Sequence, residues 1–434
     1  MFYLPLMNDN IDKSDVKSVI DFLSQDSIPK LTNGPKVVEF ERPSGGADAL
    51  KQAAELLSNA KFPVILNGAG VVLSSGIPAS AALAERLDAP VCCGYQHNDA
   101  FPGNHPLFAG PLGYNGSKAG MELISKADVV LALGTRLNPF STLPGYGIDY
   151  WPKDAKIIQV DINADRIGLT KDVTVGIVGD AKKVAEELLS SLSDHAGESN
   201  RADRKATIAK TKSAWAQELT SMDHEDDDPG TTWNERARSD KPDHMSPRMA
   251  WRAIQAAMPN NAIISSDIGN NCAIGNAYPS FQEGRKYLAP GLFGPCGYGF
   301  PAIAGAKIAQ PNVPVIGFAG DGAFGISMNE MSSCAREEWP AIAMVIFRNY
   351  QWGAEKRNTT LWFDDNFVGT ELDPELSYAK VADACGLKGV TVRTMEETTV
   401  AIKQSCEDQK KGITTFIEVI LNQELGEPFR RDAM

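Results

Sequence analysis

The residues best suited to chemistry are a carboxylate and an amide that each follow an apolar run. Asp321 stands between Gly320 and Gly322, at the end of PVIGFAGD, and 26 residues separate Gly322 from Asn349. Glycines beside an acid let the backbone approach a phosphate, and a lone carboxylate there can hold a hard divalent cation. Asp321, Asn349, a backbone carbonyl, two diphosphate oxygens and a water would give Mg²⁺ six oxygen ligands. The alternative is a glycine-rich turn in which Asp321 only caps a helix.

Two parallel strands must position these side chains. The runs VPVIGFAGD and AIAMVIFRN predict buried strands, and the segment between them predicts a helix through MNEMSSCAREE. In an open α/β sheet, ligands lie beyond the carboxyl ends of the strands, where helix N-termini present unpaired N–H groups. If the two strands are neighbours, Asp321 and Asn349 face the same point above the sheet edge.

The same alternation of short apolar strands and amphipathic helices continues along most of the chain. It predicts an α/β protein with two doubly wound parallel-sheet domains. We expect an atypical N-terminal leader over residues 1–42, a first domain over 43–195, a charged linker over 196–244 and a second domain over 245–434. The linker contains Asp226, Asp227 and Asp228, and tandem acids point in different directions, which favours a solvated segment over a metal site.

Composition excludes several classes of protein. The chain has 42 Lys and Arg against 55 Asp and Glu and no basic patch, so we expect no nucleic-acid partner. No run approaches the roughly 20 apolar residues of a membrane span, and the N-terminus lacks the pattern of a signal peptide, so we expect a cytoplasmic protein. Seven cysteines without a CxxC pair and five scattered histidines argue against zinc, a disulfide framework and histidine metal chemistry.

The Gly-Asp-Gly triplet followed by Asn349 resembles the motif of enzymes that use thiamine diphosphate. The resemblance implies that the backbone carbonyl of Gln351 is the third protein ligand of Mg²⁺. Two further stretches, SSDIGNNC and GLFGPCGYGFPAIAGA, are similar to the family's diphosphate loop and to the loop that contacts the rest of the cofactor. The implied metal ligands are Asp321, Asn349 and Gln351, and the implied cofactor-binding residues are Gly269, Asn270, Asn271, Gly294, Cys296, Gly320, Asp321, Gly322, Ala323, Asn349 and Gln351.

One departure from the family pattern concerns Cys296. By the resemblance, the Gly294 carbonyl receives the pyrimidine amino group, and Cys296 stands where a Met or Leu wedges the cofactor into its bent conformation. Cysteine is smaller than either residue, so the wedge contact is in question, and simple packing competes with the role of a catalytic thiol. We also expect the face around Gly294, Cys296 and Phe300 to be apolar and exposed.

Four residues beyond the metal loop are candidates for anion contacts. Tyr350, Trp352, Lys356 and Arg357 could reach anionic substrate groups, and a solvated surface is the alternative for Lys356 and Arg357.

The first α/β domain resembles the middle domain of the same superfamily, which holds FAD or ADP in some members. Gly68-Ala69-Gly70 follows a predicted strand, but Leu73 replaces the third small residue of the dinucleotide fingerprint. We therefore expect no bound dinucleotide.

Long stretches, notably the one that begins VCCGYQHNDAFPGNHPLFAGPLGYNG and the terminus LGEPFRRDAM, are similar to those of one group within this acetolactate synthase-like superfamily. On these stretches, residues 40–434 resemble the sulfoacetaldehyde acetyltransferases. That resemblance implies thiamine diphosphate and Mg²⁺ as cofactors, a small sulfonated aldehyde and phosphate as substrates, and acetyl phosphate and sulfite as products. An acetolactate synthase-like enzyme and a non-catalytic cofactor-binding fragment are the alternatives.

Enzymes of this family carry an N-terminal pyrimidine-binding domain with a Glu that activates the cofactor. The sequence begins about where that domain would end, and LTNGPKVVEFE in the leader resembles the start of sugar aminotransferases. We therefore expect the catalytic Glu to come from elsewhere, through a homo-oligomer or a partner that carries the pyrimidine-binding domain, and the chain alone to be inactive.

Overall fold

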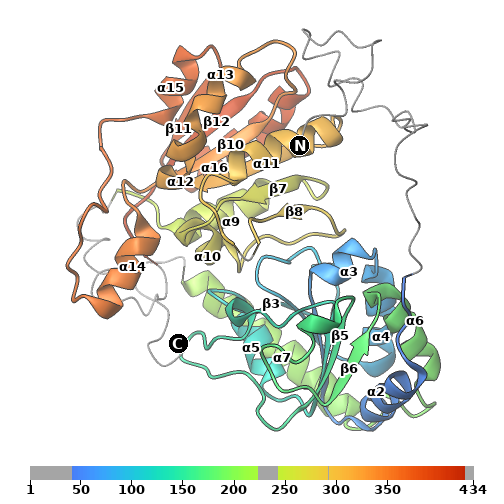
Figure 1. Cartoon of the computed structure of the whole chain (residues 1–434). Helices are drawn as coiled ribbons and strands as arrows, with labels where there is room; N and C mark the ends of the chain where they lie inside the picture. Colours follow the sequence, from blue (N-terminus) through green and yellow to red (C-terminus); the bar gives the residue numbers. More distant parts are fainter. Residues whose placement is uncertain (1–41, 223–242, 292, 426–434) are drawn as a thin grey trace, which may run out of the picture.

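The computed structural model describes residues 42–222 and 243–425, apart from residue 292. The expectations for the leader before residue 42 and for Asp226, Asp227 and Asp228 fall outside the described residues. Two α/β units lie one above the other, one drawn in blue to green and the other in yellow to red (Figure 1). In the described part of the chain, no helix has both the length and the apolar character needed to cross a membrane.

The first unit is built on a six-stranded sheet in which all paired strands are parallel. Its central strands are apolar and buried on both faces, as a parallel sheet covered by helices requires. Across the sheet the strands are β3 (Phe108–Pro111), β2 (Val91–Cys93), β1 (Pro63–Asn67), β4 (Val129–Leu133), β5 (Lys156–Asp161) and β6 (Val175–Val178). Helices α2 (Ala47–Asn59), α4 (Ile77–Leu87) and α6 (Ala181–Ser191) cover one face, α5 (Lys118–Ile124) lies on the other, and the short α3 (Ala69–Leu73) follows β1.

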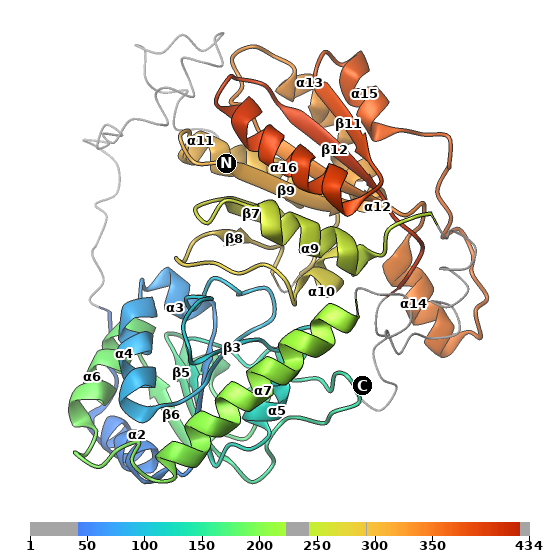
Figure 2. The same ribbon diagram turned by 180° about the vertical axis from the view of Figure 1, so that it is seen from behind.

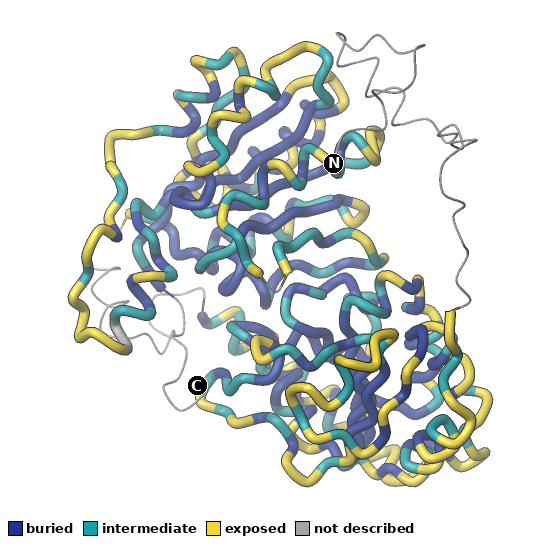
Figure 3. Tube along the Cα trace, viewed as in Figure 1, coloured by how far each residue is buried: buried dark blue, intermediate teal, exposed yellow. Residues whose placement is uncertain are grey.

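The second unit repeats this plan with a second parallel six-stranded sheet. Across the sheet the strands are β11 (Lys388–Val392), β12 (Thr415–Ile420), β10 (Ala343–Arg348), β9 (Val315–Gly320), β7 (Ile263–Ser266) and β8 (Tyr287–Leu288). Helices α9 (Pro247–Ala257) and α16 (Met395–Gln409) cover one face (Figure 2), while α11 (Gly299–Ala309), α12 (Asp321–Ser327), α13 (Met331–Cys334) and α15 (Tyr378–Ala384) cover the other. Figure 3 shows that both sheets are buried along most of their length, which confirms the predicted α/β fold class.

Side-chain caps fix where several helices begin. The Asp180 carboxylate accepts from the backbone N–H groups of Lys182 and Lys183 at the start of α6. Thr394 and Glu397 form a reciprocal capping box at the start of α16, which satisfies two N–H groups that the helix leaves unpaired. The expected helix through MNEMSSCAREE is shorter, because α12 passes through a 3-10 turn into α13, which ends at Cys334.

The segment expected to be a charged linker contains the 21-residue helix α7 (Arg201–Ser221), which runs along the first unit (Figure 2). Arg204 explains how so polar a helix is held: its buried guanidinium donates to the carbonyl oxygens of Asp88, Lys61, Ser199, Leu87 and Gly197 at 2.6–3.0 Å. Ile208 and Trp215 add apolar anchors on the same helix. The domain boundaries themselves stay a prediction.

Buried amides join the two units. Asn98 of the first unit donates through Nδ2 to the carbonyl oxygens of Asn276 and Pro279, both at 2.9 Å. In return, Asn276 donates through Nδ2 to the carbonyl oxygens of Leu112 and Tyr114 at 3.2 and 3.3 Å. Because Asn98 and Asn276 are fully buried, each hydrogen bond replaces one that water would otherwise make, and the units are held in one arrangement.

We expect Asn98→Ala to lower the free energy of unfolding by about 2 kcal/mol, because two buried carbonyl oxygens lose their donor. Urea denaturation followed by circular dichroism measures this change. Asn59→Ala is the matched control, since Asn59 also donates to a carbonyl, that of Glu55, but is exposed. Equal effects of the two substitutions would contradict the structural role of Asn98.

Candidate functional site

The predicted site residues surround one cavity at the carboxyl edge of the second sheet. This strand-end cavity has a volume of about 220 Å³, and three loops line it, those that follow β7, β9 and β10, together with the loop before α11. All eleven residues implied by the sequence line it: Gly269, Asn270, Asn271, Gly294, Cys296, Gly320, Asp321, Gly322, Ala323, Asn349 and Gln351.

Two neighbouring strands position the acid and the amide. Strand β10 pairs in parallel with β9, and Phe347 lies opposite Gly320 in the register. Asp321 and Asn349 therefore each follow the carboxyl end of adjacent strands, as the spacing predicts. On the far side of Gly322, the Trp352 ring is so close that an added Cβ would lie 2.9 Å from it, which explains why glycine is needed there.

The Asp321 carboxylate is buried and already partly engaged. One oxygen accepts from the Gly322 N–H at 2.9 Å, and the other accepts from the Tyr350 N–H at 2.6 Å and from Arg348 Nη1 at 3.0 Å. Burial raises the pKa of Asp321 to about 6, against the opposing effect of Arg348. A carboxylate offers about four acceptor positions, so three donors leave room for a cation.

Asn349 and Gln351 each place an oxygen atom that could bind a cation at the strand-end cavity. Within residues 42–222 and 243–425, the Asn349 side chain and the Gln351 main-chain carbonyl accept no hydrogen bond. Tyr350 between them has a φ of +62°, a left-handed conformation that costs a non-glycine residue about 1 kcal/mol. That turn brings the residues on both sides of Tyr350 to the wall of the strand-end cavity.

This donor set suits Mg²⁺ better than a transition metal, because it consists of one carboxylate, one amide and one carbonyl oxygen. No cluster of three or more His, Cys, Asp or Glu residues that could hold a metal is found in the described part of the chain. The predicted Mg²⁺ site agrees with that finding, because Asp321 is its single charged protein ligand. Ligation by Asp321, Asn349 and Gln351 stays a prediction.

The opposite wall offers a donor for a phosphate. Gly269 precedes the short helix α10 (Asn270–Gly275) with a φ of +122°, a conformation that a side chain would strain. Asn270 is buried, and its Nδ2 has no hydrogen-bond partner among the described residues. A buried amide donor without a partner costs free energy unless a ligand accepts from it, so the residues present fit a diphosphate group.

Asp267, which was not among the residues predicted from the sequence, positions the loop with Gly294 and Cys296. This buried carboxylate accepts from the N–H groups of Ile268, Gly297 and Gly299 at 2.7–3.0 Å. It thereby fastens that loop to the end of β7. The available signal was an acid directly after the apolar strand in AIISSD.

Cys296 itself is exposed at the cavity wall. Partial burial, followed by the nearby charges of Asp267 and Glu355, raises the pKa of its thiol. A raised pKa disfavours the thiolate that nucleophilic chemistry needs, so the structure argues against a catalytic role.

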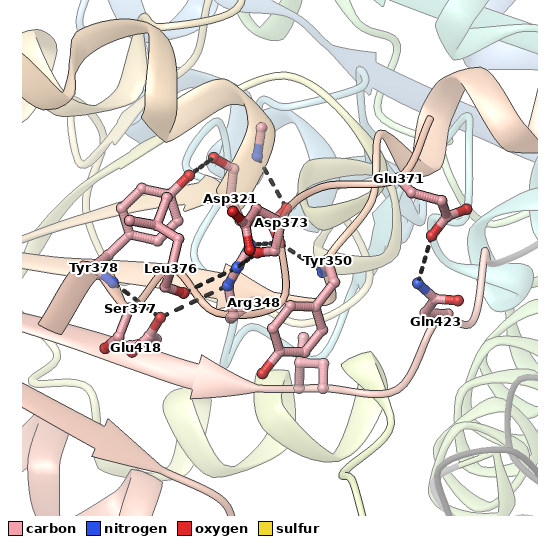
Figure 4. A network of polar contacts seen from close by, with 12 residues as sticks. Asp321, Arg348, Tyr350, Glu371, Asp373, Leu376, Ser377, Tyr378, Glu418 and Gln423 are labelled. Atoms are coloured by element: carbon pink, nitrogen blue, oxygen red, sulfur yellow. Dashed lines mark hydrogen bonds and ion pairs between the residues drawn. The ribbon is translucent and has the colours of Figure 1, made fainter. Parts of the chain in front are cut away.

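A buried ion pair that was not predicted from the sequence supports Asp321. Figure 4 shows Arg348 between Asp321 and Glu418: Arg348 Nε lies 3.8 Å from the Glu418 carboxylate, and Nη2 donates to the carbonyl oxygens of Asp373 and Leu376. Arg348 and Asp321 are each 1% exposed. The signal was a charge in each of two otherwise apolar strands, AMVIFR and TFIEVI.

The solvated surface considered as the alternative for Lys356 and Arg357 is excluded, because these residues are 1% and 5% exposed and Lys356 pairs with Glu371. One expectation is wrong. Phe300 is not part of an exposed patch, since it packs in the core against Phe324 and Phe416. The aromatic residue exposed beside Gly294 is Phe293.

The remaining two anion candidates are engaged within the protein. The Arg348 guanidinium stacks 4.2 Å from the centre of the Tyr350 ring, and Trp352 packs on Gly322.

The glycines of the first unit have a packing role. A Cβ on Gly70 would lie 2.6 Å from the Gly134 Cα, and one on Gly68 would clash with Thr135, so both allow α3 to approach the loop after β4. A cavity of about 600 Å³ lies at this sheet edge, lined in part by Ala69 and Gly70. That no dinucleotide binds there stays a prediction.

Comparison with known families gives two matches along the chain. Residues 50–188 match the family described as thiamine pyrophosphate enzyme, central domain. Residues 267–419 match the thiamine pyrophosphate enzyme C-terminal TPP binding domain, and this range includes all eleven residues of the site.

Two curated relatives are similar over almost the whole chain. The sulfoacetaldehyde acetyltransferase of Roseovarius nubinhibens is 78% identical over 400 residues, which are 92% of this chain and 66% of that protein. The probable sulfoacetaldehyde acetyltransferase of Rhizobium meliloti is 76% identical, over 92% of this chain and 68% of that protein. The chain thus spans about two thirds of the length of the relatives it matches.

A solved structure shares the fold. The crystal structure of benzoylformate decarboxylase from Polynucleobacter necessarius superposes with a TM-score of 0.69, over 93% of this chain and 69% of that one. Its sequence is only 21% identical, so this likeness concerns the arrangement of the two units.

Proposed function

The chain belongs to the thiamine pyrophosphate enzyme family, among its sulfoacetaldehyde acetyltransferases, and from that membership we propose that it takes part in acetyl transfer from sulfoacetaldehyde to phosphate. The single observation that carries the proposal is the strand-end cavity, in which eleven residues from four loops converge. High identity to relatives with one shared name favours this reaction over acetolactate synthesis or an inert fragment.

The residues of the strand-end cavity divide the work of holding the cofactor. Asp321, Asn349 and the Gln351 carbonyl would hold Mg²⁺, and Asn270 Nδ2, which has no partner among the described residues, would donate to a diphosphate oxygen. The Gly294 carbonyl would receive the amino group of the pyrimidine ring. When bound, thiamine diphosphate supplies the electron sink that lets the carbon–sulfur bond of the substrate break.

The proposed reaction balances without an external oxidant. Sulfoacetaldehyde and phosphate give acetyl phosphate and sulfite, so one carbon–sulfur bond breaks and one carbon–oxygen bond to phosphate forms. The aldehyde carbon rises to the oxidation level of an acyl group while its neighbour becomes a methyl group. Both substrates are anions, and Arg357, which donates to Asn270 at the wall of the strand-end cavity, is a positively charged side chain that suits them.

A second polypeptide segment completes the pyrimidine side of the cofactor in this proposal, in a homo-oligomer or from a partner. The support is an exposed aromatic side chain beside the strand-end cavity: Phe293 is 91% exposed, next to Gly294, and Cys296 is exposed nearby. Ile326 on α12, which packs on Gly297 of the same loop, is 56% exposed as well, and neighbouring exposed apolar side chains commonly mark contact surfaces. We also assign the protein to the cytoplasm, a location supported by seven cysteines that are all free.

We expect the purified 434-residue chain to bind thiamine diphosphate only when Mg²⁺ is present, and to release sulfite only when the pyrimidine-binding segment of a relative is added. The reason is that C2 of the cofactor is a very weak acid, and the family assigns its activation to a Glu of that segment. Calorimetry with and without EDTA measures the binding, and coupled assays of sulfite and acetyl phosphate measure turnover.

Two outcomes would count against this proposal, and they are separable. Affinity for thiamine diphosphate that is the same with EDTA as with Mg²⁺ would refute the metal site. Robust turnover by the chain alone would refute the need for a second segment while leaving the cofactor site intact.

A further inference from the structure

A second cavity opens between the two units and adjoins the strand-end cavity. This inter-unit cavity has a volume of about 410 Å³ and shares Ile268, Gly269, Gly294 and Ala354 with the strand-end cavity. Gly269 and Gly294 belong to two different loops, and both loops are expected to contact the cofactor. A group held in the inter-unit cavity therefore lies next to the place where the proposed reaction occurs.

The walls of the inter-unit cavity are fixed by buried contacts between the units. The Tyr95 hydroxyl lies 3.4 Å from Cys272 Sγ, and the Gln96 N–H donates to Asn276 Oδ1 at 3.3 Å. On the opposite side, Asp99 of the first unit accepts from the Lys286 and Tyr287 N–H groups of the second unit at 2.9 and 3.2 Å. These contacts hold the cavity in shape before a ligand arrives, which lowers the entropy cost of binding.

The lining is positively charged and contains no carboxylate. Arg136, Arg357 and His97 line the inter-unit cavity, and no Asp or Glu is present among its described lining residues. Burial, with a further contribution from Arg136, lowers the pKa of His97 to about 4, so His97 is a neutral hydrogen-bonding group at physiological pH. Arg136 and His97 also line the adjacent 600 Å³ cavity of the first unit, but that cavity differs because Asp161 and Asp180 belong to its lining.

Both arginines are placed to act on a ligand. Arg357 is 5% exposed, donates through Nη1 to Asn270 Oδ1, and stacks 4.3 Å from the centre of the Tyr114 ring, so its plane is held. Arg136 is partly exposed and makes no ion pair within the part of the chain that the structure describes. A planar guanidinium with fixed orientation recognises tetrahedral oxyanions through paired hydrogen bonds.

We propose that the inter-unit cavity binds a tetrahedral oxyanion, held by Arg357 and Arg136, beside the cofactor. The assignment of a role to this anion rests on the proposed function, which requires two such groups: the sulfonate of the aldehyde and inorganic phosphate. The shared chemistry is a compact anion with three or more oxygens on a tetrahedral centre. Tyr114 and Tyr298 also line the cavity, where their rings suit the short carbon chain of a sulfonated aldehyde and their hydroxyls suit a hydroxyl of phosphate.

Calorimetry on the full chain tests the site, with thiamine diphosphate and Mg²⁺ present so that phosphate cannot occupy the diphosphate position. Inorganic phosphate and methanesulfonate are titrated separately at constant ionic strength. We expect Arg136→Gln to weaken the binding of at least one anion about tenfold, because a charge-assisted hydrogen bond is lost. Arg136→Lys should recover part of the affinity, and Arg357→Gln should show a similar loss.

Arg166→Gln is the matched control, since Arg166 lines the adjacent cavity of the first unit but not the inter-unit cavity. Loss of phosphate binding alone assigns the site to the acceptor, loss of methanesulfonate binding alone assigns it to the substrate sulfonate, and loss of both indicates a shared site. No binding of either anion to the wild type, or equal affinities in Arg136→Gln and Arg166→Gln, would overturn the proposal. Failure of thiamine diphosphate to bind the wild type would instead refute the proposed function.

Discussion

Asp321→Ala should abolish the Mg²⁺-dependent binding of thiamine diphosphate. Asp321 is the only charged residue among the three predicted ligands, and a diphosphate needs its negative charge offset by a firmly held cation. We expect affinity to fall more than about 100-fold, beyond the loss of about 10- to 100-fold that is typical when only a supporting residue is removed. Asn349→Ala should cause a smaller loss, because it removes a neutral oxygen. Calorimetric titration of each variant with thiamine diphosphate at saturating Mg²⁺ measures the difference.

Asp321→Asn separates the loss of charge from the loss of shape. The amide oxygen of Asn can still accept from the Tyr350 N–H, so this variant should keep the local turn and yet lose the metal. Melting temperatures of all variants show whether the fold persists. If Asp321→Ala binds thiamine diphosphate with unchanged affinity, the metal site is placed wrongly.

The placement of Asp321 and Asn349 beside each other could be predicted because its determinants are local in the sequence. Each strand end carries its own signal, the triplet around Asp321 and the Asn349 that follows AMVIFR. The only non-local step was that the two strands are neighbours, and one crossover helix between parallel strands favours that arrangement. The strand-end cavity confirms the juxtaposition.

What could not be predicted depends on pairs that are distant in the sequence. Arg348 and Glu418 come from neighbouring strands 70 residues apart, and either charge alone predicts only an unusual strand. From the sequence, Arg204 is one of many charges in a polar segment. The five carbonyl groups that accept from it come together only in the folded chain. The inter-unit cavity could not be predicted either, because its charge depends on how residues of the two units come together.

Arg348→Met should cause the largest loss of stability. Methionine fills most of the volume but leaves Asp321 and Glu418 as buried carboxylates without a cation, at 1% and 3% exposure. Breaking a buried pair in this way costs about 3–5 kcal/mol, because an uncompensated charge stays buried. The carbonyl oxygens of Asp373 and Leu376 also lose their donor. Urea denaturation at neutral pH measures the change.

The double substitution Arg348→Met with Glu418→Gln tests the electrostatic cause. Glutamine removes one of the two stranded charges. Its oxygen can still accept from the Tyr378 N–H while its amide N–H donates to the Ser377 hydroxyl, so part of the lost stability should return. Arg336→Met is the control, since Arg336 pairs with Glu338 at the surface with half its side chain exposed, and it should stay close to the wild type. Calorimetry with thiamine diphosphate adds a second measurement, because a carboxylate released by Arg348 should shift its Mg²⁺ affinity in the single variant. If Arg348→Met were no less stable than Arg336→Met, the buried network would not be what holds Asp321 in place.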